Sequence, residues 1–143
     1  MTPTEPADFC VRSAEVTDVP NISTLLEPHV ARRILLPRSE EELRNLIRNG
    51  FVAELNGEIV GFVAVDIYSK KLAELQCLAV ADRCQGMGIG KRLVQACVEC
   101  TREHDVRELM AITAAEDFFE GCGFHYTLPD QKKALFISTR PRN

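Results

Sequence analysis

The sequence predicts a mixed α/β domain built on one sheet, and three features carry that prediction. Asn56-Gly57 separates two β-rich runs, and Asn-Gly in that setting is the strongest short-range signal for a β-hairpin. An apolar strand at 72–80 leads through a helix-periodic segment at 88–103 to another strand at 107–113, which is the order of a parallel crossover. The length of 143 residues, with 45% hydrophobic residues, suits a single core.

The remaining elements follow from local patterns. Residues 9–13 alternate apolar and polar side chains, as a strand does. Thr17 or Asp18 can cap a helix that Pro28 limits in length, and Ser39 opens a second helix through a capping box with a glutamate three residues later. The expected order, β-α-α-β-β-β-α-β-α-β, is completed by hairpin strands at 51–55 and 58–67, a helix at 114–120 and a last strand at 134–138.

Charge and cysteine content disfavour several classes of protein. Lys and Arg number 17 against 21 Asp and Glu, and the net charge of −4 disfavours a nucleic-acid-binding surface. No apolar run approaches the roughly 20 residues that span a bilayer, and the acidic start of the chain is unlike a secretory signal. The six cysteines lie mostly in apolar segments, which predicts a reduced, cytoplasmic protein. Residues 1–8 are expected to form a flexible tail and 9–143 one domain.

The most informative segment is the loop between strand 72–80 and helix 88–103. It carries glycines at alternate positions, 86, 88 and 90, so the backbone can adopt positive φ and approach a ligand closely. The helix that begins there presents free N–H groups and the positive end of its dipole, which bind phosphate-type anions. The spacing fits neither the Walker A motif nor the dinucleotide fingerprint. A tight strand-to-helix connection without a ligand is the alternative interpretation.

Residues 85–90, Gln-Gly-Met-Gly-Ile-Gly, resemble the Arg/Gln-x-x-Gly-x-Gly/Ala signature of the GNAT superfamily of N-acetyltransferases. Residues 115–124 resemble that superfamily's Ala-x-x-Phe-Tyr-x-x-x-Gly-Phe motif, and the resemblance extends over residues 9–138. Within the superfamily the chain is most similar to the acetyltransferase domain of bacterial N-acetylglutamate synthases, through residues 35–39, 73–80 and 118–124. The resemblance implies a GNAT-like acyl-CoA N-acyltransferase fold, with a mostly antiparallel sheet and a parallel crossover at the CoA site.

The resemblance also implies which residues hold acetyl-CoA, the expected cosubstrate. The pantetheine arm would pair with the backbone of Leu78 and Val80, and an N–H near Ala79 would stabilise the oxyanion. The loop amides would hold the pyrophosphate. The full set of expected acetyl-CoA contacts is Leu78, Ala79, Val80, Arg83, Gln85, Gly86, Met87, Gly88, Ile89, Gly90, Lys91 and Phe119.

Catalysis is expected to proceed by direct attack of the acceptor amine. Glu74 matches an acidic position of the family and would act as the general base. Arg38 would bind an acceptor carboxylate through its guanidinium. Many relatives protonate the leaving thiolate with a tyrosine at the position of Phe119, so Tyr126 or a water would take that role here. Scattered histidines and a lone Cys-x-x-Cys pair on a helix predict no metal site.

The expected function is transfer of an acetyl group to a primary amine of a small molecule, an amino acid such as glutamate. Two departures from the glutamate-binding pattern leave the acceptor open: Lys132-Lys133-Ala134 replaces an Arg-x-Ser, and residues 65–67 lack an expected basic residue. A CoA-binding regulatory module without catalysis, and a protein or peptide N-acetyltransferase, remain alternatives. Neither nucleic acid nor membrane is an expected partner, and a homodimer is left open.

Overall fold

The structure is a computed structural model that describes residues 8–125, 135 and 137–140. Its strands are β1 (Cys10–Ser13), β2 (Gly50–Leu55), β3 (Glu58–Ile67), β4 (Leu72–Val80) and β5 (Glu108–Met110). Its α-helices are α1 (Val19–Ala31), α2 (Glu40–Leu46), α3 (Ile89–Glu103) and α4 (Glu116–Gly121). Short 3-10 helices cover Val16–Asp18, Ile47–Asn49 and Asp82–Cys84.

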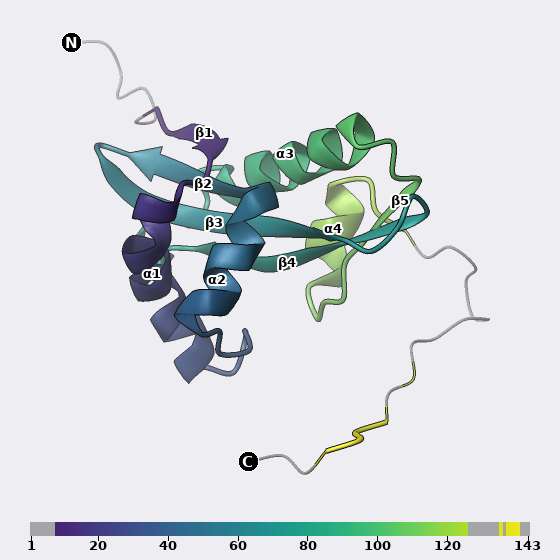
Figure 1. Ribbon diagram of the computed structural model, residues 1–143. Coiled ribbons are helices and arrows are strands. Elements are labelled where there is room, and N and C mark those ends of the chain that lie inside the picture. The colour runs from purple at the N-terminus through teal and green to yellow at the C-terminus, as the bar shows by residue number, and fades with distance from the viewer. Residues whose placement is uncertain (1–7, 126–134, 136, 141–143) are drawn as a thin grey trace.

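The strands form one mixed sheet in the order β1-β2-β3-β4-β5 (Figure 1). The first three pairs are antiparallel and β4–β5 is parallel, which confirms the predicted hairpin and crossover. Asn56 and Gly57 both have positive φ, 52° and 80°, as a two-residue turn of the favoured hand requires. The capping box at Ser39 is also confirmed, since its side chain accepts from the Glu42 amide at 3.1 Å.

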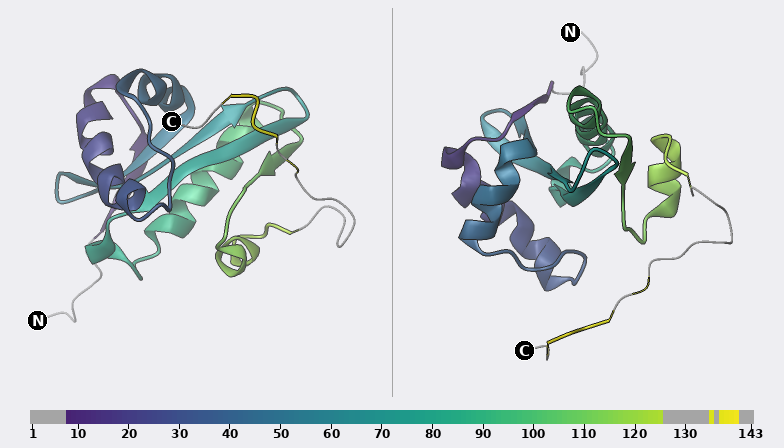
Figure 2. Two further views of the ribbon diagram at one scale, coloured as in Figure 1. Left: turned by 90° about the horizontal axis from the view of Figure 1, so that it is seen from below. Right: turned by 45° about the vertical axis from the view of Figure 1, so that its right-hand side comes forward.

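Helices cover both faces of the sheet. Helices α1 and α2 lie on one face, and α3 lies on the other, with α4 on the α3 side beyond β5 (Figure 2). Each face has its own apolar cluster, one around Phe62 and Ile22 and one around Val63 and Leu93. Gly61 lets α3 pack closely, because a Cβ there would lie 2.9 Å from Leu93 Cδ1.

A bulge in β4 determines where the functional side chains point. Phe62 pairs with Ala79 and Ala64 pairs with Gln76, so β4 contains one more residue than β3 over this interval. Cys77 has a φ of 59° at the bulge. The extra residue reverses the alternation of β4: Ala73 and Leu75 belong to the α3-side cluster, whereas Cys77 and Ala79 belong to the α1-side cluster.

Several predicted boundaries were wrong. Helix α1 continues past Pro28 to Ala31, because the Pro28 carbonyl still accepts a hydrogen bond, at 3.1 Å from the Arg32 amide, and buried Leu26 and His29 anchor the last turns. The strand predicted at 107–113 pairs only over 108–110.

The expected strand at 134–138 is not found where it can be assessed. Residues 135, 137 and 138 are not in a strand, and Leu135 and Ile137 are exposed, whereas 134 and 136 lie outside the described residues. All six cysteines are free. Over the described ranges, no helix has both the length and the apolar character needed to cross a bilayer.

Candidate functional site

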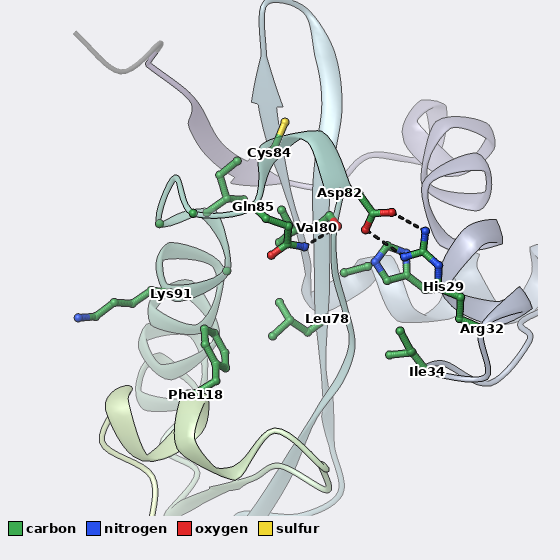
Figure 3. A pocket seen from close by; sticks show the side chains of 15 residues that line it. His29, Arg32, Ile34, Leu78, Val80, Asp82, Cys84, Gln85, Lys91 and Phe118 are labelled. Atoms are coloured by element: carbon green, nitrogen blue, oxygen red, sulfur yellow. Dashed lines mark hydrogen bonds and ion pairs between the residues drawn. The ribbon is translucent and has the colours of Figure 1, made fainter. Parts of the chain in front are cut away.

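A cavity of about 510 Å³ opens beside the C-terminal half of β4 (Figure 3). Nine of the predicted acetyl-CoA residues line it: Leu78, Ala79, Val80, Gln85, Gly86, Gly88, Ile89, Gly90 and Lys91. Strand β5 pairs with β4 only as far as Glu74, so within the described part of the chain no strand pairs with the β5-side edge of residues 76–80. The cavity therefore meets an open strand edge at one end and the start of α3 at the other.

The backbone at the start of α3 is free to bind an anion. Gly86 and Gly88 have φ of 83° and 85°, and Gly88 caps α3 without any side-chain hydrogen bond. The first helical bond runs from the Arg92 amide to the Gly88 carbonyl at 3.1 Å. Among the described residues, the amides of 86–91 have no hydrogen-bond acceptor. These N–H groups at the positive end of the helix dipole suit a phosphate or diphosphate.

Gln85 differs from the residues that follow it. Its amide donates to the Asp82 carbonyl at 3.2 Å, so that N–H is not available to a ligand. Its side-chain Nε2 donates to the Val80 carbonyl at 3.3 Å and thereby folds over the end of β4. The predicted contact of Gln85 with acetyl-CoA is therefore one for its side chain and not for its backbone amide.

The opposite wall comes from the end of α1, which the sequence interpretation did not include. Arg32 donates to both carboxylate oxygens of Asp82, at 3.1 and 2.5 Å, and joins α1 to the loop. This hydrogen bonding holds the pKa of Asp82 below its ordinary value. Buried His29 and exposed Ile34 line the same wall. No periodicity pointed to these residues, because only the tertiary fold brings α1 against the loop.

Three predicted acetyl-CoA contacts do not line the cavity. Arg83 pairs with Glu58 at 2.5 Å, and Met87 packs against the α3-side cluster. Phe119 is buried, 5.1 Å from Phe118 and 5.3 Å from Phe124 between ring centroids. The neighbouring Phe118 lines the cavity instead, and its ring packs over Gly90, where a Cβ would lie 3.3 Å from Phe118 Cζ. Contacts of Arg83, Met87 and Phe119 with the cosubstrate stay predictions.

A second cavity of about 430 Å³ lies where α2 and the 3-10 helix after it cover β3 and β4. Its lining includes Arg38, Asp66 and Gln76. Arg38 Nη2 donates to Gln76 Oε1 at 3.2 Å, and Gln76 Nε2 lies 3.4 Å from Glu74 Oε1. The two predicted functional residues, Arg38 and Glu74, are therefore joined through Gln76, which the sequence did not single out.

Tyr68 completes this group, although no sequence pattern indicated it. Its hydroxyl donates to Glu74 Oε1 at 2.5 Å and accepts from Gln76 Nε2 at 3.3 Å. The hydrogen bond to Glu74, with burial and the charges of Glu74 and Asp66, raises the pKa of Tyr68 to about 12. The phenol is therefore protonated at neutral pH and remains a donor to Glu74.

The linings of the two cavities come near each other along β4. Gln76 lines the second and Leu78 the first, and Cys77 separates them in the strand. Two residues of strand span at most about 7 Å. Tyr126 and residues 132–134 lie outside the described residues.

Comparison with known proteins places this geometry among acetyltransferases. The model of the acetyltransferase (GNAT) family matches residues 21–124. An uncharacterized N-acetyltransferase of Chlorobaculum tepidum is 36% identical over 118 residues, 82% of this chain and 76% of that protein. An amino-acid acetyltransferase of Neisseria meningitidis is 31% identical over 123 residues, 85% of this chain but only 28% of that protein.

A solved structure agrees with these relatives. The N-acetylglutamate synthase of Neisseria gonorrhoeae, complexed with coenzyme A and N-acetyl-glutamate, superposes with a TM-score of 0.73 and 29% identity. The match covers 82% of this chain and 28% of that one. The chain thus spans little more than a quarter of these two Neisseria proteins.

Proposed function

The chain belongs to the acetyltransferase (GNAT) family, and we propose that it transfers the acetyl group of acetyl-CoA to the amino group of a small amino acid. The observation that carries this proposal is the row of amides at 86–91 that have no acceptor within residues 8–125, beside the edge of β4 that has no strand partner there. That arrangement offers a diphosphate a helix N-terminus and offers a pantetheine arm a strand edge.

The residues present fit the cosubstrate. Neither Gly86 nor Gly88 has an atom within 4 Å of an added Cβ, so a phosphate can approach the amides from that side. Beyond the loop, the backbone of 78–80 has no strand partner on the β5 side among the residues that the structure describes, and it can pair with pantetheine amides. This route directs the thioester toward the bulge at Cys77.

The acceptor would enter from the second cavity. Arg38 Nε is buried without a hydrogen-bond partner among the described residues, and the guanidinium can bind a carboxylate. Glu74, two residues before Gln76 on β4, would take a proton from the ammonium or from the attacking amine. The amine nitrogen then bonds to the thioester carbonyl carbon, and a backbone N–H near Ala79 donates to the oxyanion.

Collapse of the tetrahedral intermediate breaks the C–S bond and releases CoA as a thiolate. The thiolate requires a proton, for which Tyr126 or a water remains the candidate. The products are the N-acetylated amino acid and CoA. The predicted role of Glu74 is confined to deprotonation of the acceptor, since Glu74 does not line the cavity assigned to the cosubstrate.

Release of free thiol from acetyl-CoA, measured with a panel of amino acids, tests the proposal. We expect turnover with at least one amino acid and stabilisation of the protein by CoA in thermal melts. Glu74→Gln should lower kcat by roughly a hundredfold or more while the Kd for CoA is unchanged, and Glu99→Gln, at an exposed position of α3, serves as a control outside the site. Absence of thiol release with every amino acid of the panel would refute the proposal, whether or not CoA stabilises the protein.

A further inference from the structure

We propose that Asp66 makes the acceptor cavity selective for amino acids with one carboxylate and a neutral or basic side chain, at the expense of dicarboxylic acids. This inference rests on the proposed function and specifies its substrate class. It starts from the charges that line the second cavity. Arg38 and Arg48 are basic, and Glu42 and Asp66 are acidic, so the lining carries no excess positive charge among the described residues.

Arg38 is suited to hold one carboxylate. It is the partly buried cation of the cavity, and its guanidinium is positioned by Gln76 at 3.2 Å and Glu42 at 4.0 Å. Its Nε is buried and has no hydrogen-bond partner among the described residues. Glu42 already offsets part of its charge, so a second carboxylate would have to be held elsewhere.

Within the part of the chain that the structure describes, Arg48 is the other basic residue of the lining, and it is a weak candidate for that second carboxylate. It is exposed, on the 3-10 helix at the rim, where water screens its charge. Asp66 is half-buried on β3, beneath the acceptor, so its charge is screened less.

Asp66 is also an uncompensated anion. It lies opposite Glu74 in the β3–β4 register, and like charges that face each other across strands are unfavourable. Within the described chain its contact is Gln76 Nε2 at 3.4 Å, and no cation pairs with it. A neutral amide or a cation on the acceptor side chain would donate to Asp66, whereas a carboxylate would be repelled.

The test compares L-glutamine with L-glutamate, which have the same shape and differ in charge. With wild-type protein and saturating acetyl-CoA, we expect kcat/KM for glutamine to exceed that for glutamate by at least about tenfold. Asp66→Asn should bring the ratio close to one, mainly by raising kcat/KM for glutamate. Arg44→Gln, at an exposed arginine of α2 that does not line the cavity, is the control and should leave the ratio within about twofold of wild type.

Thermal stabilisation of the CoA-loaded protein by each amino acid is measured in parallel, because it reports selectivity in amino-acid binding independently of turnover. Glutamine-selective stabilisation without thiol release would refute the proposed function and support this inference. Thiol release with glutamate equal to or better than glutamine would support the function and overturn the inference. An unchanged ratio in Asp66→Asn, a loss of glutamate turnover in Arg48→Gln, or no stabilisation by either amino acid would also overturn it.

Discussion

Two glycines of this chain permit a matched test of the anion site. Gly88, at the start of α3, has a φ of 85°, and Gly57, in the β2–β3 turn, has a φ of 80°. An added Cβ has no atom within 4 Å at either position. Alanine at each site therefore introduces backbone strain of about 1–2 kcal/mol and no clash. Both variants should melt a few degrees below wild type, by roughly 3–8 °C.

Only the Gly88 variant should affect CoA. Its methyl group would occupy the space through which a diphosphate reaches the amides of 86–91. Each hydrogen bond lost to a charged group is worth about 1.5–3 kcal/mol. A single lost bond therefore raises the Kd for CoA by roughly tenfold to a hundredfold in Gly88→Ala. Gly57→Ala should bind CoA as wild type does.

Isothermal calorimetry with CoA measures both Kd values, and thermal melts without ligand confirm that the two variants are equally destabilised. Equal CoA affinity in the two variants would refute the reasoning, because it would mean that the ligand does not approach the loop backbone at Gly88. Equal weakening in both would refute it as well, since the effect would then follow stability and not the site.

Three other predictions concern stability and ionisation. Asp18 accepts hydrogen bonds from Arg12 that hold the pKa of Asp18 below its ordinary value. The stabilisation from this pair is therefore complete above about pH 4 and is lost as the pH falls further. Asp18→Asn should flatten the decline of Tm at acid pH. Ultraviolet titration should find a pKa of about 12 for Tyr68 in the wild-type protein and a pKa nearer the ordinary value of tyrosine in Glu74→Gln. The same pKa in both proteins would contradict the hydrogen bond between Tyr68 and Glu74. Gly61→Ala should overpack α3 against the sheet and lower the free energy of unfolding, measured in urea, by about 1–3 kcal/mol. An unchanged urea midpoint of unfolding would contradict the close packing of α3 at this position.

The sequence alone was enough to predict those elements that depend on residues close together in the chain. The hairpin turn depends on two adjacent residues that accept positive φ, and α2 begins at a capping box within four residues. The anion loop was visible for the same reason, because alternate glycines and the start of α3 are contiguous in the chain. Pro28 shows the limit of such rules, since buried contacts of its neighbours keep the helix intact.

Which side chains come into contact depends on the tertiary structure. The bulge at Cys77 arises from the pairing of β4 with β3, and no local pattern marks it. Arg38 and Glu74 were found separately, but their connection runs through Gln76, which contacts Glu74 on its own strand and Arg38 from a distant loop. The wall formed by Arg32 likewise depends on a partner 50 residues away. Periodicity describes the neighbours of a residue along the chain, whereas a site depends on contacts between segments that only the folded chain brings together.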